Sequence, residues 1–269
     1  MPTEPAAITE DNASQVAAGA PMTSSLISFQ DTMSFQTLTE EVGTYDGPEG
    51  GSITAGFDID AAPVGVVSTG DRFSVTFNDC MLDVDFRING GIVIDFESII
   101  GDWQVDDMWS VDFGFAINSL TFSSGPVQGS FDGNWSQSAS YDTGDKAFDL
   151  AGDFMTAVND GTGWRAASFD GLTLGWSYDA TAMEASYSVD GQFASTDLGG
   201  SVLLSTIAPF VTRDADEYPY AGTLVCEGAG GSTLTLTVLD ETEVQLDVDA
   251  DGDGTAEYTD TLTWFELDV

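Results

Sequence analysis

The sequence contains no histidine and only five basic residues among 269, against 46 acidic ones. Without histidine, the chain lacks the usual general base near neutral pH and the commonest ligand of transition metals. A net charge of -41 repels nucleic acids and anionic membranes, so we expect no role in binding DNA or RNA. We expect the chain to attract cations and basic surfaces instead.

Sequence motifs of common enzymes are also missing. The chain has no Gly-x-Ser-x-Gly elbow and no glycine-rich phosphate loop that carries a lysine. Pairs of carboxylates could serve a glycosidase, but 46 acids give no reason to choose one pair over another. We therefore predict a protein that is not an enzyme.

Long hydrophobic runs are absent as well. No apolar stretch approaches the ~20 residues that a membrane-spanning helix needs, so we predict that the chain does not span a membrane. Residues 1–20 lack the basic and apolar regions of a signal peptide. Either the protein is cytosolic, as an acidic protein of a halophile would be, or a leader has already been removed.

Cysteine occurs only twice, as Cys80 and Cys226. One long-range disulfide in an oxidising compartment and two buried free thiols are both compatible with this count.

What the sequence does contain is a period-two alternation of apolar and polar residues. In "MLDVDFRING" the apolar positions are 82, 84, 86 and 88, and Asn89-Gly90 then predicts a hairpin turn. Similar runs recur along the chain, and helix signals are scarce. We predict an all-β, antiparallel meander that forms a barrel or sandwich, with helix in under about a fifth of the residues.

Three regions are expected along the chain. Residues 1–25 form an extended or short-helical N-terminal segment, in which Asp11 or Asn12 could cap a helix. Residues 26–198 form the main antiparallel β domain. Residues 199–269 form a C-terminal β-hairpin unit that packs on the main domain or completes it. A weak echo between "SFDGNWSQSASYD" and "SFDGLTLGWSYD", about forty residues apart, fits either two successive hairpins of the meander or a coincidence in a chain rich in Ser, Gly and Asp.

One stretch, "DVDADGDGTAEYTD", carries the pattern of a calcium-binding loop. Acidic residues stand at positions 1, 3, 5, 9 and 12 counted from Asp249, and Gly254 stands at position 6, where such a loop turns sharply. Position 12 is Asp rather than the usual bidentate Glu. The alternative is a plain hairpin turn whose Asp-Gly pairs supply positive φ. The candidate Ca²⁺ ligands are Asp249, Asp251, Asp253, Thr255, Glu257 and Asp260.

The aromatic residues allow two interpretations. With 6 Trp, 17 Phe and 7 Tyr, the chain could line a cavity for an apolar molecule or a glycan. Aromatic residues in β proteins more often form cross-strand pairs in the core.

The two ends of the chain and one central hairpin resemble a known group of proteins. "YPYAGTLVC", "DADGDG" and the closing "TLTW", with "AITEDNASQVA" near the start and "TFNDC" in the middle, are similar to uncharacterised, acidic, β-rich secreted or lipid-anchored proteins of Gram-negative bacteria. The resemblance implies an exported protein, secreted, periplasmic or at the cell surface, whose leader has been removed. In that setting we predict that Cys80 and Cys226 form a disulfide. The resemblance carries no activity.

These observations lead to one main functional hypothesis and one alternative. The main hypothesis is an exported, non-enzymatic β protein with a structural or surface-interaction role, as a cell-surface, filament or adhesion component. Residues 1–25 could add a strand to a neighbouring copy and so build a homo-oligomer or filament. The alternative is a β-barrel that binds an apolar molecule or a glycan.

Overall fold

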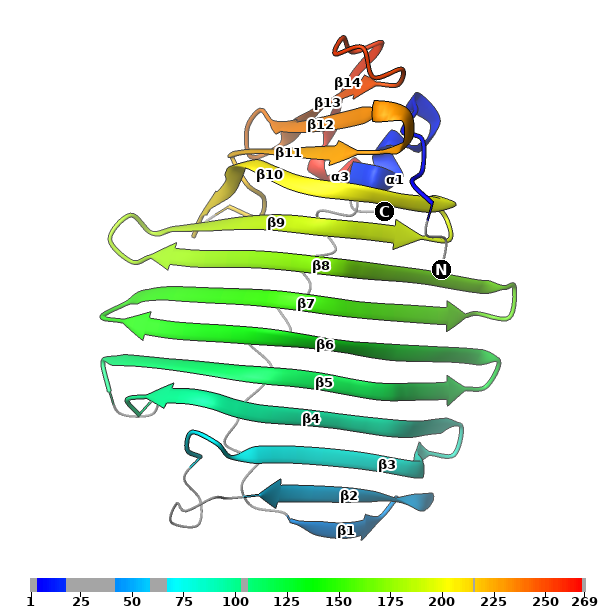
Figure 1. Cartoon of the computed structure of the whole chain (residues 1–269), viewed down its shortest axis with the longest axis vertical. Helices are drawn as coiled ribbons and strands as arrows, with labels where there is room; N and C mark the ends of the chain where they lie inside the picture. Colours follow the sequence, from blue (N-terminus) through cyan, green and yellow to red (C-terminus); the bar gives the residue numbers. More distant parts are fainter. Residues whose placement is uncertain (1–3, 18–41, 59–66, 103–105, 215, 268–269) are drawn as a thin grey trace. The chain divides into compact units, whose positions relative to one another are not determined.

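The computed structural model describes residues 4–17, 42–58, 67–102, 106–214 and 216–267. In these residues fourteen antiparallel strands form one sheet, in which every strand follows its neighbour in sequence order (Figure 1). Strands hold 69% of the residues and helices 7%, which confirms the predicted antiparallel all-β meander. The sheet is not closed into a barrel, and the described residues form no second sheet, so the predicted barrel or sandwich is wrong.

The strands and helices have the following bounds. The strands are β1 (Gly43–Asp46), β2 (Gly50–Asp58), β3 (Arg72–Asp83), β4 (Phe86–Ile100), β5 (Met108–Ser124), β6 (Val127–Asp142), β7 (Asp145–Asn159), β8 (Trp164–Asp179), β9 (Glu184–Ser195), β10 (Gly200–Arg213), β11 (Ala221–Glu227), β12 (Thr233–Val238), β13 (Glu243–Asp249) and β14 (Tyr258–Thr263). The helices are η1 (Glu10–Asn12), α1 (Ala13–Ala17), η3 (Ala229–Gly231) and α3 (Trp264–Leu267).

Alternation along each strand decides which side chains share a face. In β5, Phe113 and Phe115 are buried, whereas Asp112 before them and Gly114 between them lie on the opposite, more exposed face. Because successive side chains of a strand point to opposite faces, the period-two pattern of the sequence becomes one apolar and one polar side of the sheet.

Asn89-Gly90 does not form the predicted hairpin turn. Strand β4 runs through both residues, and the turn lies earlier, between the paired residues Asp83 and Phe86. The β4–β5 register shifts between Asn89 and Gly91, and Gly90 has φ 113°. A Cβ on Gly90 would lie 2.5 Å from the carbonyl oxygen of Ser119 on β5. The Asn-Gly pair therefore serves a β-bulge, which needs the same backbone freedom as a tight turn.

The weak internal echo corresponds to two strands of the meander. The first copy lies in β6 and the second in β8, with β7 between them in the sheet order. The prediction of two successive hairpins is thus confirmed.

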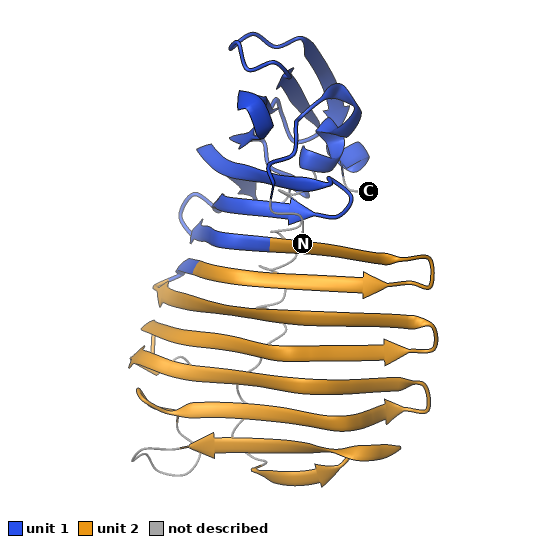
Figure 2. Cartoon of the chain, turned by 45° about the vertical axis from the view of Figure 1, so that its right-hand side comes forward, with its two compact units in different colours: residues 1–32, 144–149, 169–269 blue, residues 33–143, 150–168 orange. Residues whose placement is uncertain are grey.

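The chain divides into two compact units (Figure 2). Unit 1 comprises residues 1–32, 144–149 and 169–269, and unit 2 comprises residues 33–143 and 150–168. The boundary expected at residue 198 instead lies inside unit 1, in the turn between β9 and β10.

The part of unit 1 formed by β11 to β13 has a largely aliphatic core. The inward positions of β11 to β13, such as Leu224, Leu236 and Leu246, are at most 1% exposed. Helix α1 packs against β12 and α3, and it contributes Val16, which is fully buried. The short helix expected near the N-terminus is therefore present. The 3-10 turn η1 leads into α1, and its N-cap is Thr9 rather than Asp11 or Asn12; the backbone N–H of Thr9 donates to the Oδ1 of Asn12.

Unit 2 has an aromatic core along β3 to β6. Phe73, Ile94, Phe96 and Phe113 are buried in one cluster, which Trp135 borders as a half-buried neighbour. Phe115 and Trp135 stack with ring centroids 4.5 Å apart. The interpretation of the aromatic residues as cross-strand core pairs applies to this cluster.

None of the helices in the described part of the chain has the length and apolar character needed to cross a membrane.

Candidate functional site

The acidic loop between β13 and β14 gathers four of the six predicted ligands. Strand β13 ends at Asp249 and β14 begins at Tyr258, and Val248 pairs with Tyr258 at the base of the loop. One carboxylate oxygen from each of four residues lies within 4.8 Å of the other three. The group consists of Asp249, Asp251, Asp253 and Glu257.

Backbone amides hold this cluster in place. Asp249, which is only 7% exposed, accepts hydrogen bonds from the N–H groups of Gly252 (2.7 Å), Asp253 (3.2 Å) and Gly254 (2.7 Å). Glu257 accepts one from the N–H of Ala250 at 2.7 Å. The loop therefore orders its carboxylates through its own backbone, in the manner of Asx turns.

The other two predicted ligands are placed differently. Asp260 lies in β14, where it pairs with Leu246 and accepts a hydrogen bond from the hydroxyl of Tyr258 at 2.9 Å. Thr255 donates its backbone N–H to Asp253 at 2.8 Å. The acidic cluster therefore offers the four carboxylates that Ca²⁺ or another hard cation prefers, and position 12 of the sequence pattern is not one of them.

The two cysteines do not form the predicted disulfide. Both are free and fully buried, Cys80 in β3 of unit 2 and Cys226 in β11 of unit 1. Seven strands separate β3 from β11 in the sheet order. The sequence placed both residues in alternating runs, but it did not show that those runs belong to different units. Burial raises the pKa of the Cys226 thiol to about 12, which keeps it protonated and unreactive at neutral pH.

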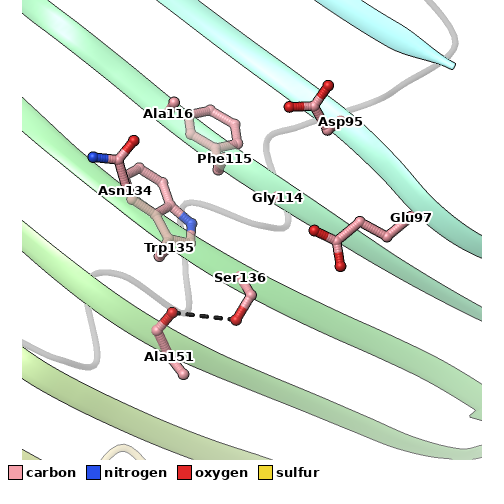
Figure 3. Close-up of a pocket in the computed structure, with 9 residues that line it drawn as sticks. All are labelled: Asp95, Glu97, Gly114, Phe115, Ala116, Asn134, Trp135, Ser136 and Ala151. Atoms are coloured by element: carbon pink, nitrogen blue, oxygen red, sulfur yellow. Dashed lines mark hydrogen bonds between the residues drawn. The ribbon is translucent and has the colours of Figure 1, made fainter. Parts of the chain in front are cut away.

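A shallow pocket lies on the polar face of unit 2 (Figure 3). Its floor consists of small residues, including Gly114, Ser136 and Ala151. The carboxylates of Asp95 and Glu97 on β4 lie at one side. The Glu97 carboxylate leans over Gly114, since a Cβ there would lie 3.2 Å from its Oε1.

Asp95 in this pocket is neutralised by one of the few basic residues. Arg72 pairs with its carboxylate at 2.7 Å and 2.9 Å. Glu97 is exposed, and it is the carboxylate of this pocket that is open to a cationic group. Both partners of the Arg72 pair are about half exposed, so the pair contributes little stability.

A second pocket lies where β4, β6 and β8 begin and β5 ends. It is lined by Arg87 and Asn89 of β4, by Ser123 of β5, by Gln128 of β6 and by Trp164 of β8. Sequence reasoning missed this pocket, because alternation predicts the face of each residue but not the register that brings four strands together. The one available signal was Trp164, an aromatic residue directly after the turn sequence "NDGTG".

The described part of the N-terminal segment docks on its own chain. The N–H of Ala6 donates to the carbonyl oxygen of Ser201 at 2.9 Å, and Pro5 forms a parallel bridge with Ser201. Ile8 is fully buried, and its N–H donates to the hydroxyl of Ser232 at 3.0 Å. Residues 18–25 of the predicted segment lie outside the described residues.

Comparison with known proteins finds no matching family model, no similar curated protein and no similar solved structure. The resemblance to exported bacterial proteins stays a prediction from the quoted motifs.

Proposed function

We propose that this chain is an exported, non-enzymatic β protein with a structural or surface-interaction role. The observation that carries the proposal is the open sheet, whose polar face in unit 2 remains accessible along β4 to β6. On that face Asp95 pairs with Gly114, and Asp112 pairs with Ser138. A broad face of small and acidic side chains suits contact with an extended partner, and its charge favours cations or basic surfaces.

The sheet edge at β14 is protected against direct pairing with another copy. The N–H of Thr261 donates to the carboxylate of Asp260 at 2.9 Å, and the N–H of Thr263 donates to Glu266 at 2.8 Å. These carboxylates occupy backbone donors and repel a second acidic chain. A filament built through the N-terminal segment would therefore need exchange, in which residues 4–17 of one copy replace those of its neighbour.

The role of the polar face can be tested with two charge-matched variants. Glu97→Gln/Asp112→Asn removes two charges from the face, and Asp46→Asn/Glu49→Gln removes two exposed charges elsewhere in unit 2. We expect wild-type protein and the second variant to cosediment with intact cells of the producing organism, and the face variant to stay in solution. Wild-type protein that neither cosediments nor associates in analytical ultracentrifugation would contradict the proposal.

Export has a separate test. Antibodies against the chain should label intact producing cells. Labelling only after the cells are permeabilised would favour the alternative of an acidic cytoplasmic protein from a halophile.

We also propose that the acidic cluster of the β13–β14 loop binds Ca²⁺ weakly and stabilises the C-terminal hairpin. The proposal is supported by the four converging carboxylates, whose mutual repulsion a cation would relieve. The thermal midpoint should rise with millimolar Ca²⁺ by more than with Na⁺ at matched ionic strength.

Variants separate specific binding from general screening of the negative charge. Asp251→Asn should lose the Ca²⁺-specific part of the rise, and Glu241→Gln, which removes an exposed acid outside the cluster, should keep it. Equal shifts with Ca²⁺ and Na⁺, or an Asp251→Asn variant that responds like wild type, would show that the loop is only a turn.

A further inference from the structure

The pocket near Trp164 is built on two rows of polar side chains that cross three strands. Arg87, Ser123 and Gln128 form one row of register partners. Two residues along each strand, Asn89, Thr121 and Ser130 form the second row. Because residues two apart on a strand share a face, both rows present their polar groups on the same side of the sheet.

Trp164 adds an aromatic surface to these rows. It is 55% exposed, and the other described tryptophans are buried or half-buried. Trp164 lines the same pocket as Arg87 and Gln128, although it begins a strand two places beyond β6 in the sheet order. An exposed indole beside amides and hydroxyls combines an apolar plane with donors and acceptors, which is the composition of a small-molecule site.

Two polar groups of the pocket are held by their neighbours. The guanidinium of Arg87 donates to both carboxylate oxygens of Asp79 at 3.0 Å. Asn89 accepts the backbone N–H of Asp79 through its Oδ1, which leaves its NH₂ group as the free donor. These side chains are positioned before any ligand arrives, so less ordering is required on binding.

The charges of the pocket select against ionic ligands. The Arg87–Asp79 pair is neutral as a unit, so the pocket offers an anion no uncompensated positive charge. The net charge of -41 repels anions further. None of the described residues that line the pocket is a carboxylate, so an organic cation finds no direct counter-ion among them. An uncharged ligand rich in hydroxyl groups fits best.

We propose that this pocket binds one residue of a neutral glycan. The apolar face of the sugar ring stacks on the indole of Trp164. The ring hydroxyls exchange hydrogen bonds with Gln128, the NH₂ group of Asn89 and the hydroxyls of Ser123 and Ser130. The cavity volume of about 260 Å³ is below the roughly 300–1,000 Å³ typical of drug-sized ligands, which suits a single sugar unit within a longer chain.

This inference rests on the proposed surface-interaction role and names a partner class for it. Glycan binding by the pocket and the surface-interaction role can each be contradicted without contradicting the other. Soluble oligosaccharides test the pocket, whereas cosedimentation of the polar-face variants tests the role.

The experiment uses the full chain labelled with 5-fluorotryptophan, in which Trp164→Phe assigns the ¹⁹F resonance of Trp164. The probes are cellotetraose, maltotetraose, mannotetraose and chitotetraose, with trigalacturonic acid and tetramethylammonium as charged comparisons. We expect at least one neutral probe to shift the Trp164 resonance selectively at concentrations up to about 10 mM. The charged probes should leave that resonance unchanged.

Variants then locate the binding. Isothermal titration of the responding probe should show affinity at least about tenfold weaker in Trp164→Ala and in Gln128→Ala. Phe265→Ala, which removes an exposed aromatic ring in α3 of unit 1, should bind like wild type. Thermal unfolding of each variant confirms that the sheet is intact.

The proposal is overturned by any of three results. They are no response of Trp164 to any neutral probe, a response to tetramethylammonium or trigalacturonic acid alone, and unchanged affinity in folded Trp164→Ala.

Discussion

Units 1 and 2 bury their apolar surface in different ways. In unit 1 the inward side chains of β11 to β13 are aliphatic and nearly inaccessible, and the two short helices α1 and α3 supply further apolar groups. Trp264 of α3 stacks on Tyr218 with centroids 5.8 Å apart and meets Phe210 edge-on at 6.4 Å. This region follows the usual arrangement, in which helices pack on one face of a sheet.

Unit 2 lays several aromatic rings beside glycines of neighbouring strands, a contact that also occurs in unit 1, where Gly222 lies beside Phe210. Gly152 of β7 lies against Trp135 of β6, and a Cβ on Gly133 would lie 2.6 Å from the Cβ of Phe154. Phe154 stacks on Phe131 at 6.0 Å. Each glycine leaves room for a large ring on the neighbouring strand, a device known from the aromatic rescue of glycine in sheets.

An apolar strand pattern therefore does not by itself specify that a second layer covers the sheet. Aliphatic residues in unit 1 gain their burial from covering elements, whereas rings in unit 2 gain part of theirs from neighbours in the same sheet. The two cores should therefore respond to different substitutions.

The largest expected effect is a cavity in unit 1. Leu246 is 1% exposed and pairs with Leu236, so Leu246→Ala should lower the free energy of unfolding by about 3 kcal/mol. Urea unfolding measures the loss. Thr235→Ala on the opposite face of the neighbouring strand is the control, with an effect within about 0.5 kcal/mol. A loss under about 1 kcal/mol for Leu246→Ala would remove the distinction between the units.

A smaller effect is expected when a methyl group is added in unit 2. A Cβ on Gly152 would lie 2.5 Å from the Cα of Trp135, so Gly152→Ala should push β6 and β7 apart and cost about 2 kcal/mol. Gly163→Ala, at a position with open space, serves as the control. If both variants unfold at the same urea concentration, close glycine–aromatic packing does not stabilise unit 2.

Alkaline pH should weaken unit 1 specifically. Burial raises the pKa of Cys226 from 9.0 to about 12 and raises the pKa of Tyr187 as well, and both residues belong to unit 1. Between pH 9 and about 12 the unfolded chain releases the Cys226 proton while the folded chain keeps it. The contribution of this buried thiol to the free energy of unfolding is therefore fully present below pH 9. It falls as the pH rises, by up to about 1.4 kcal/mol per pH unit.

The control for the alkaline effect is Cys226→Ala. Its urea midpoint should decline less steeply between pH 9 and 11 than that of wild type. Identical slopes would show that the buried thiol does not couple folding to pH.

The sequence predicted those features of the fold that depend on neighbours along the chain. Alternation located the strands, and the Asp-Gly pairs located the loop between Val248 and Tyr258. The prediction of a hairpin turn at Asn89-Gly90 was wrong because a bulge and a turn both require a residue that accepts positive φ. The local pattern predicts the backbone conformation of these two residues, but it does not predict whether the chain reverses direction after them.

Features that depend on contacts between strands far apart in the sequence could not be predicted from the sequence alone. The pairing of Cys80 with Cys226 required knowledge of the strand order, and the open sheet could not be told from a barrel by alternation alone. The acidic cluster was largely predicted because its ligands follow one another in a single loop. The pocket at Trp164 was not, because its residues come from β4, β5, β6 and β8.

Hydrogen exchange followed by mass spectrometry tests most directly the claim that the two units bury their cores differently. Peptides that cover β12 and β13 of unit 1 should exchange slowest, through global unfolding alone, because the inward side chains of these strands are buried. Peptides that cover β3 of unit 2, where half of the residues are exposed, should exchange faster through local opening. Equal protection of both regions, or slower exchange in β3, would contradict the account.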